Sequence, residues 1–177
     1  MAENKILLLD IDGVMSPLGV DEVDLDSLER NSGWSSWSMK HIAGFNMAIS
    51  QQLISSLKTL AAHKDIIAVW CSTWERESRL FGKDLNLGEN WDFLNIAELP
   101  RGTSLDKKTL FVQQTLLNNP QSSKAVWVDD GAIPSKKVLD EAFKGVGLYP
   151  DGLLTVKPDK RTGLTRKQYE SIVRFLK

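Results

Sequence analysis

The sequence has 177 residues, of which 42% are hydrophobic and 25% charged, and this composition excludes a disordered or fibrous chain. Its net charge of -1 excludes a general attraction to nucleic acid or anionic lipid, although a local basic patch remains compatible with it. The single cysteine excludes an internal disulfide, and no apolar stretch approaches the roughly 20 residues that span a bilayer, so we expect one cytoplasmic domain without a membrane segment.

The first predicted element is a strand within Lys5–Val14, an apolar run that ends in Asp10 and Asp12. A short apolar run without alternation is typical of a strand buried on both faces of a parallel sheet. Ligands bind at the carboxyl ends of such strands. Because side chains two residues apart on an extended segment point the same way, we expect both carboxylates to face one substrate.

Residues 15–49 are predicted to form a flap or loop insertion. Met15–Asn31 is polar and contains turn residues, which indicates a loop. We interpret the aromatic and serine-rich stretch Gly33–Ile42 as a flap or hairpin over the mouth of the site, although the sequence leaves open whether residues 33–47 cover it. Trp34 and Trp37 either contact substrate there or cover the edges of the core.

The next segment, residues 50–71, is predicted to complete a strand-helix-strand unit with the first strand. Helical spacing predicts a helix over Ser50–His63 with Ser50 as its N-cap, and Asp65–Cys71 is predicted to be a second buried strand. Cys71 is then expected to be a buried, inert strand residue. A right-handed crossover places the end of this strand, with Ser72, beside the end of the first.

The rest of the chain continues this alternation of helices and strands, which predicts an α/β fold: one three-layer, Rossmann-like domain over residues 1–177 with a central parallel sheet. The remaining predicted elements are a helix over Glu75–Phe81, a strand over Trp91–Ala97, a helix over Asp106–Leu117 capped by Thr103 or Ser104, a strand over Ala125–Val128, a helix over Ser135–Phe143, a strand over Leu153–Val156, and a final helix opened by a capping box at Thr165.

Polar side chains follow three of these strands and open one helix: Asp10 and Asp12, then Ser72 and Thr73, then Lys107 and Lys108, and last Asp129 and Asp130. Carboxylates gathered at one sheet edge repel each other unless a cation joins them, and an oxygen-rich, sulfur-free site suits Mg²⁺. A hydroxyl and a lysine beside that metal are suited to holding phosphate oxygens. The combination indicates a phosphoryl-transfer site.

These motifs, in this order, resemble those of phosphatases of the haloacid dehalogenase (HAD) superfamily. Trp70-x-Ser72-Thr73-Trp74, the stretch 126–130 and Gly163-Leu164-Thr165 are similar to the small HAD domains of RNA-repair ("Swiss Army Knife") proteins. The resemblance implies a HAD-like fold with a minimal cap or none, a phosphatase activity, bound Mg²⁺ and an aspartyl-phosphate intermediate.

The resemblance also implies roles for individual residues. Asp10 is the expected nucleophile, and Asp12 the group that protonates the leaving oxygen and then activates water. Ser72 would donate a hydrogen bond to a phosphoryl oxygen, with Thr73 as the alternative. Lys108 would neutralise charge on the nucleophile and the phosphate, because it lies one helical turn before a buried residue; Lys107 is the rival.

The expected metal ligands are Asp10, Asp12 through its carbonyl, Asp129 and Asp130. The insertion between the first two motifs is too short for a folded cap, and an open site suits a large substrate, so we expect a nucleic-acid end or a nucleotide phosphate, with bases stacked on Trp34, Trp37 and Trp74.

Three alternatives remain open at this point. A small-molecule phosphatase such as a 5'-nucleotidase has the same motifs. A phospho-acceptor signalling domain uses similar residues in the reverse order, and a non-catalytic binding protein on the same fold is disfavoured because every motif is intact. The oligomeric state is not predicted.

Overall fold

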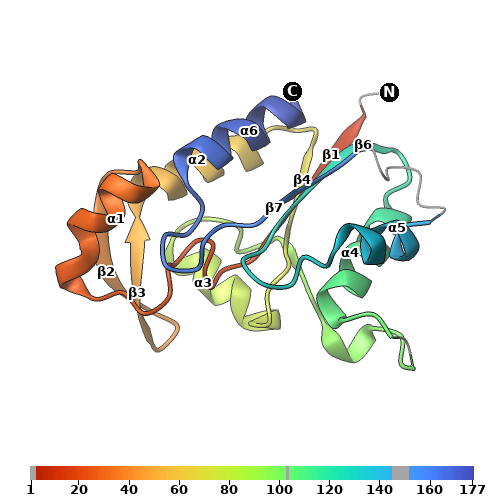
Figure 1. Ribbon diagram of the computed structural model, residues 1–177, viewed down its shortest axis with the longest axis horizontal. Coiled ribbons are helices and arrows are strands. Elements are labelled where there is room, and N and C mark those ends of the chain that lie inside the picture. Colours follow the sequence, from red (N-terminus) through yellow and green to blue (C-terminus); the bar gives the residue numbers. More distant parts are fainter. Residues whose placement is uncertain (1–2, 103, 145–151) are drawn as a thin grey trace.

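The computed structural model describes residues 3–102, 104–144 and 152–177, and it has three layers around a central sheet (Figure 1). In these residues the sheet has five parallel strands, which confirms the predicted α/β fold. In spatial order the strands are β5 (Asp92–Phe93), β4 (Ile66–Trp70), β1 (Asn4–Leu9), β6 (Ser122–Val128) and β7 (Leu153–Val156).

Alternate residues of the central strand β1 point to opposite faces of the sheet. Leu7 and Leu9 belong to a core cluster that includes buried residues of α2 (Gln51–Ala61) and α6 (Arg166–Leu176). Ile6 and Leu8 belong to a second cluster with residues of α4 (Lys107–Asn118) and α5 (Lys136–Ala142). Figure 1 shows these helix pairs on either side of the sheet. Continued alternation puts Asp10, the next residue after β1, on the face covered by α4 and α5.

The connection from β1 to α2 differs from its prediction in one part. It contains a helix, α1 (Leu25–Ser32), where the sequence predicts a loop over Met15–Asn31. Leu28 and Ser32 are the buried residues of this helix, so its apolar pattern is too sparse to reveal it. The following residues form an antiparallel hairpin of β2 (Trp37–Ile42) and β3 (Phe45–Ser50), one of the two forms expected for this stretch.

Two further predictions are wrong. The strand predicted over Trp91–Ala97 is reduced to the two residues of β5, because a 3-10 helix over Ile96–Glu98 follows it. Asp106 caps α4 in place of Ser104, since its carboxylate accepts a hydrogen bond from the Thr109 backbone N–H at 3.0 Å. Thr103, the other predicted cap, lies outside the described residues.

The other predicted caps are confirmed, and the segment after β4 is helical as expected. The Ser50 side chain accepts from the Leu53 N–H, and Thr165 forms a capping box with Gln168. A 3-10 turn over Glu75–Glu77 leads into α3 (Ser78–Asp84). No helix within the described ranges is both long and apolar enough to cross a membrane.

Candidate active site

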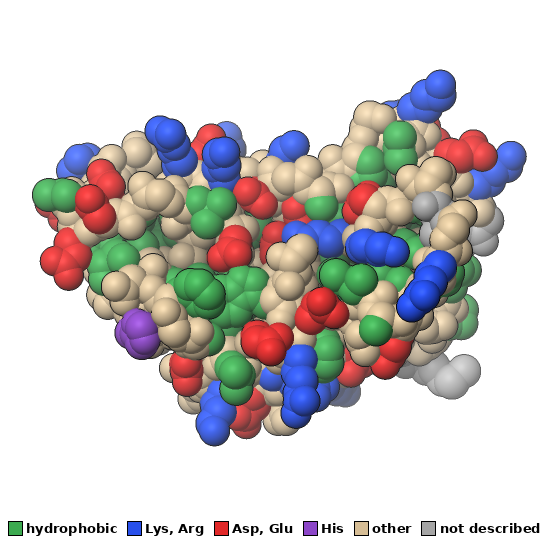
Figure 2. Space-filling model, turned by 90° about the horizontal axis from the view of Figure 1, so that it is seen from below, with side chains coloured by type: hydrophobic (Ala, Val, Ile, Leu, Met, Phe, Trp, Pro, Cys, Tyr) green, Lys and Arg blue, Asp and Glu red, His purple; other side chains and the backbone are tan. Residues whose placement is uncertain are grey.

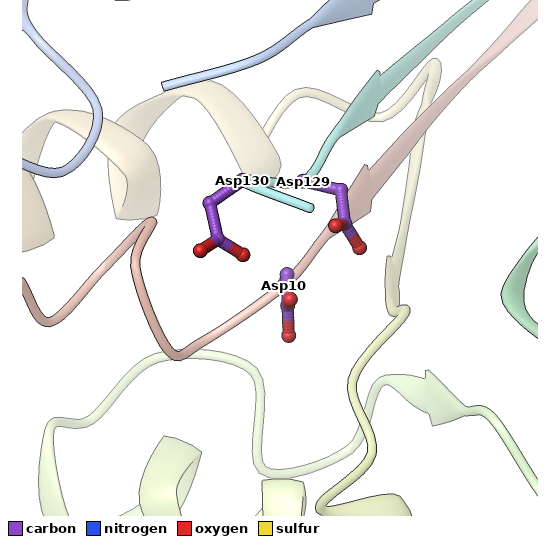
Figure 3. A group of neighbouring side chains, drawn as sticks. All are labelled: Asp10, Asp129 and Asp130. Carbon is purple, nitrogen blue, oxygen red and sulfur yellow. The ribbon is translucent and has the colours of Figure 1, made fainter. Parts of the chain in front are cut away.

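Asp10 and Asp129 follow neighbouring strands at the same register. Leu9 pairs with Val128 in the parallel ladder of β1 and β6, and the Asp10 backbone N–H continues this ladder with a 3.1 Å bond to the Val128 carbonyl. Paired residues of adjacent strands point to the same face and lie about 5 Å apart. The two carboxylates therefore lie next to each other, as Figure 3 shows, and both are buried, with 4% and 0% of their surface exposed.

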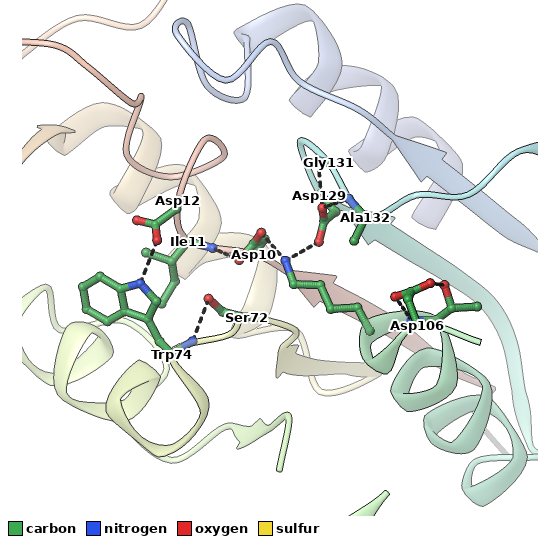
Figure 4. Close-up of polar contacts among 11 residues, drawn as sticks. Asp10, Ile11, Asp12, Ser72, Trp74, Asp106, Asp129, Gly131 and Ala132 are labelled. Carbon is green, nitrogen blue, oxygen red and sulfur yellow. Dashed lines mark hydrogen bonds and ion pairs between the residues drawn. The ribbon is translucent and has the colours of Figure 1, made fainter. Parts of the chain in front are cut away.

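A lysine from the first turn of α4 lies between these two carboxylates. The Lys108 ammonium donates a hydrogen bond to Asp10 Oδ2 and another, of 2.6 Å, to Asp129 Oδ2. Figure 4 draws these contacts as dashed lines that end on Asp10 and Asp129. Burial alone disfavours the charged ammonium, but the two carboxylates outweigh it and raise the pKa of Lys108. Lys107, the rival on sequence grounds, has an exposed side chain.

A third carboxylate, that of Asp130, completes a cluster. One oxygen from each of Asp10, Asp129 and Asp130 lies within 4.8 Å of the others. Asp129 is further held by its Oδ1, which accepts hydrogen bonds from the backbone N–H groups of Gly131 and Ala132 at 2.9 and 2.5 Å. The loop that follows β6 thus fixes the Asp129 carboxylate.

The positive charge of Lys108 does not balance the three carboxylates of this cluster without an additional cation. Burial raises the pKa of Asp10 to about 6, with Asp129 adding to the effect and Lys108 opposing it. Burial and the neighbouring Asp129 likewise raise the pKa of Asp130. When all three carboxylates are ionised, one ammonium leaves two negative charges in excess. The all-oxygen donor set and this charge fit a divalent ion such as Mg²⁺.

The Asp12 carboxylate does not join this cluster, and the expectation that it faces the same substrate as Asp10 stays a prediction. The extended backbone ends before Asp12, because the Ile11 carbonyl accepts hydrogen bonds from the N–H groups of Met15 at 2.8 Å and Ser16 at 3.1 Å in a tight turn. The Asp12 carboxylate lies outside the three-carboxylate cluster and accepts a 2.9 Å hydrogen bond from the Trp74 indole Nε1 (Figure 4). A metal-binding role for the Asp12 backbone carbonyl stays a prediction.

Ser72 follows the end of β4, the strand that flanks β1 on the side opposite to β6. The parallel ladder of β1 and β4 extends to Cys71, the residue before Ser72, because the Cys71 N–H donates a 2.8 Å hydrogen bond to the Leu9 carbonyl. Ser72 is 1% exposed, and its Oγ accepts a weak 3.4 Å hydrogen bond from the Trp74 backbone N–H, which leaves its hydroxyl hydrogen for another acceptor. Thr73, the alternative, is exposed.

The turn after Ser72 has a feature that the sequence analysis missed. Glu75 adopts a positive φ of 47°, a conformation that costs a residue with a side chain roughly 1 kcal/mol. Its Oε2 accepts a 2.9 Å hydrogen bond from the Ile96 N–H, which ties the turn to the 3-10 helix that begins at Ile96. This turn orients Trp74 toward Asp12, and no local sequence signal marks such a long-range bond.

The three tryptophans expected to contact substrate differ in their burial and in their distance from the site residues along the contacts they make. Trp34 is 2% exposed, its Nε1 donates to the Leu164 carbonyl at 2.7 Å, and its ring packs edge-on against Tyr169, so it cannot stack on a base in this arrangement. Trp37 is half-buried and donates to the Trp34 carbonyl. Trp74 is half-buried beside Asp12 and, of the three, is the one whose contacts reach the site.

A pocket opens beside Asp12, and we call it the Asp12 pocket. It has a volume of about 250 Å³ and is lined by Asp12, Ser16, Pro17, Leu18, Gly19, Val20, Phe45, Asn46, Met47, Ala48 and Trp74. The start of β3 thus borders the site. Figure 2, which shows the molecule from below, has hydrophobic side chains gathered next to acidic and basic ones. A larger cavity of about 480 Å³, between β4, β5 and α4, contains none of the predicted site residues.

Comparison with known proteins identifies relatives of this architecture. The family model described as "HAD domain in Swiss Army Knife RNA repair proteins" matches residues 6–169. Among curated proteins compared by sequence, none matches.

Two solved structures of Legionella pneumophila effectors share the fold. The effector Ceg4, solved with an N-terminal yeast Hog1p sequence, has 12% identity and a TM-score of 0.56, with 99% of this chain and 96% of that chain covered. The HAD domain of the effector Lem4 has 11% identity and a TM-score of 0.55, with 97% and 92% covered. At these identities the likeness concerns the fold alone.

Proposed function

The chain belongs to the family of HAD domains in Swiss Army Knife RNA repair proteins, and from this premise we propose that it is a Mg²⁺-dependent phosphomonoester hydrolase. The observation that carries the proposal is the Lys108 ammonium joined to both Asp10 and Asp129, with the Asp130 carboxylate within 4.8 Å of them. A buried carboxylate held by a lysine beside a cation site is suited to attack a phosphorus atom.

In the first proposed step, an Asp10 oxygen attacks phosphorus while the bond to the leaving oxygen breaks, and Asp12 gives its proton to that oxygen. In the second step, water attacks the phosphorus of the aspartyl-phosphate and gives a proton to Asp12. The bond from phosphorus to Asp10 then breaks, which releases phosphate and restores both carboxyl groups to their starting state.

The remaining side chains are proposed to hold the phosphoryl group. Lys108 neutralises charge on Asp10 and on the phosphoryl oxygens, and Ser72 donates its free hydroxyl hydrogen to one of them. Asp10, Asp129 and Asp130 would hold the Mg²⁺, which supplies positive charge to the phosphate oxygens when bound.

We propose a nucleic-acid end or a nucleotide phosphate as the substrate, and a cytoplasmic location. The family description supports this substrate. Exposed lysines at the starts of two helices also support it: Lys107 opens α4, and Lys136 and Lys137 open α5. Such side chains attract the phosphates of a nucleic-acid backbone. Comparing kcat/KM for a 5'-mononucleotide and a 5'-phosphorylated oligonucleotide separates this substrate from that of a small-molecule 5'-nucleotidase.

The proposal is tested by phosphate release from a panel of phosphomonoesters, measured with Mg²⁺ and with EDTA, for wild type, Asp10→Asn and Asp12→Asn. We expect Mg²⁺-dependent turnover by wild type and no phosphoenzyme in Asp10→Asn. Asp12→Asn should still form the phosphoenzyme slowly from an activated ester. Asp26→Asn, which changes an exposed carboxylate of α1, is the matched control. Turnover in EDTA equal to that in Mg²⁺, or full activity of Asp10→Asn, contradicts the mechanism.

A further inference from the structure

We propose that the Asp12 pocket binds the leaving group of the substrate and selects one that carries an uncharged aromatic ring. This inference rests on the proposed phosphatase activity and adds the chemistry of the leaving group. It follows from the position, the lining, the charge and the size of the pocket.

The position of the pocket ties it to the leaving oxygen. Asp12 lines the pocket, and Asp12 is the group proposed to protonate that oxygen. Trp74 lines the same pocket, and its indole N–H holds the Asp12 carboxylate at 2.9 Å. A group that fills the pocket therefore touches both the proton donor and the side chain that orients it.

The lining of the pocket is suited to a flat ring. Phe45, at the start of β3, lies with its ring centroid 5.4 Å from that of Trp74, and the two rings are tilted by 51°. The Phe45 side chain is 60% exposed and Leu18 is 40% exposed, so both present apolar surface to an incoming ligand. Two aromatic rings from separate elements offer a ligand ring stacking and edge contacts.

The charge of the pocket disfavours a further negative group there. Among its described lining residues, Asp12 is the single ionisable side chain, and no lysine or arginine is present. A second phosphate in the pocket would lie beside the Asp12 carboxylate without a counter-ion. The ring that binds is therefore uncharged, and any further phosphates of a longer substrate lie outside this pocket.

The size of the pocket limits the ligand to one ring system. Its volume of about 250 Å³ is below the roughly 300 to 1,000 Å³ typical of pockets that enclose drug-sized ligands. A phenyl ring or a nucleobase has the required size and lacks charge. These are two sources of the same chemistry, and matched substrates distinguish them.

The test measures kcat/KM in Mg²⁺ for two pairs of phosphomonoesters. In the first pair, 2-phenylethyl phosphate and butyl phosphate both release a primary alcohol and differ in the ring. In the second pair, adenosine 5'-monophosphate and ribose 5-phosphate differ in the base. We expect wild type to prefer the ring-bearing member of at least one pair by about tenfold, the effect of one stacked ring. The preferred pair identifies the ring as aryl or nucleobase.

Two variants connect that preference to the pocket. Phe45→Ala removes an exposed side chain and should abolish the preference, mainly by raising KM of the ring-bearing ester. Leu117→Ala is the matched control, because Leu117 is 55% exposed on α4 and does not line the pocket. Its preference should equal that of wild type.

Each failure has a distinct meaning. Equal kcat/KM within both pairs for wild type, or a Phe45→Ala variant that keeps the preference, overturns the pocket assignment and leaves the phosphatase activity standing. Absence of Mg²⁺-dependent turnover of every ester overturns the proposed function and this inference with it.

Discussion

The carboxylate of Asp130 lies directly against Gly13, so that a Cβ built on this glycine would be 2.4 Å from Asp130 Oδ2. Gly13 also has a positive φ of 69°, which a residue with a side chain rarely adopts. The turn after Asp10 therefore needs a glycine both for its backbone and for the approach of a carboxylate from the loop after β6. This contact links the first and last acidic motifs of the site.

Replacing Gly13 with alanine should weaken the metal site. The new Cβ pushes the Asp130 carboxylate away from Asp10 and Asp129, so we expect Mg²⁺ affinity to fall at least about tenfold. Titration calorimetry with Mg²⁺ measures this directly. Gly102→Ala is the control, because Gly102 has a similar φ of 78° but nothing within 4 Å of its Cβ position. Equal Mg²⁺ affinities for the two variants would show that the close approach of Asp130 to Gly13 does not affect Mg²⁺ binding.

Removing the ammonium between the two buried carboxylates should destabilise the metal-free protein. The side chains of Lys108, Asp10 and Asp129 are 11%, 5% and 1% exposed, so Lys108→Met leaves two buried carboxylates without their partner. We expect the free energy of unfolding in EDTA to fall by about 3 kcal/mol. Urea unfolding followed by circular dichroism measures this change.

Added Mg²⁺ should recover much of that loss, because a cation again neutralises the carboxylates. The Mg²⁺-induced stabilisation is then larger for Lys108→Met than for wild type. Lys107→Met, an exposed neighbour, should change the free energy of unfolding by less than about 0.5 kcal/mol. Similar losses in the two lysine variants argue against the buried ion-pair network.

Trp74 should act as a positioning residue for Asp12. Trp74→Phe keeps an aromatic ring but removes the N–H that donates to Asp12 Oδ2. We expect kcat for alkyl phosphates to fall about tenfold, the effect of one hydrogen bond to a charged group. Aryl phosphates with good leaving groups should lose less, since their leaving oxygen needs less protonation.

The ratio of the two kcat losses is the readout, because a merely structural defect lowers both equally. Trp91→Phe is the control, since Trp91 packs on Trp70 in the core and lies outside the Asp12 pocket. An equal loss of kcat on alkyl and aryl esters in Trp74→Phe excludes the positioning role.

Cys71 should be chemically inert in the folded protein. Burial raises the pKa of the Cys71 thiol well above its usual value, and the side chain is fully buried. A raised pKa means that less thiolate is present at any given pH, and the thiolate is the reactive form. At about pH 8 we expect no reaction with Ellman's reagent in the native state and one equivalent in concentrated guanidinium chloride. Rapid labelling of native protein would show that β4 opens readily.

The sequence alone determined most of the helices and strands and the edge of the sheet at which the site lies. The apolar run that ends at Asp10 and the one that ends before Asp129 are local patterns, and parallel strands of this kind gather their carboxyl ends together. The order of the motifs was sufficient for the resemblance to the HAD superfamily, which the family match confirms. Helix α1 escaped prediction because its apolar pattern is too sparse.

Only the tertiary structure decided which of these side chains meet. Register and helix position bring Lys108 to Asp10 and Asp129 and leave Lys107 exposed. A tight turn directs Asp12 to Trp74, and α6 together with the loop before it buries Trp34. These contacts join residues far apart in the chain, so they depend on how elements pack together, which no local pattern of residues encodes.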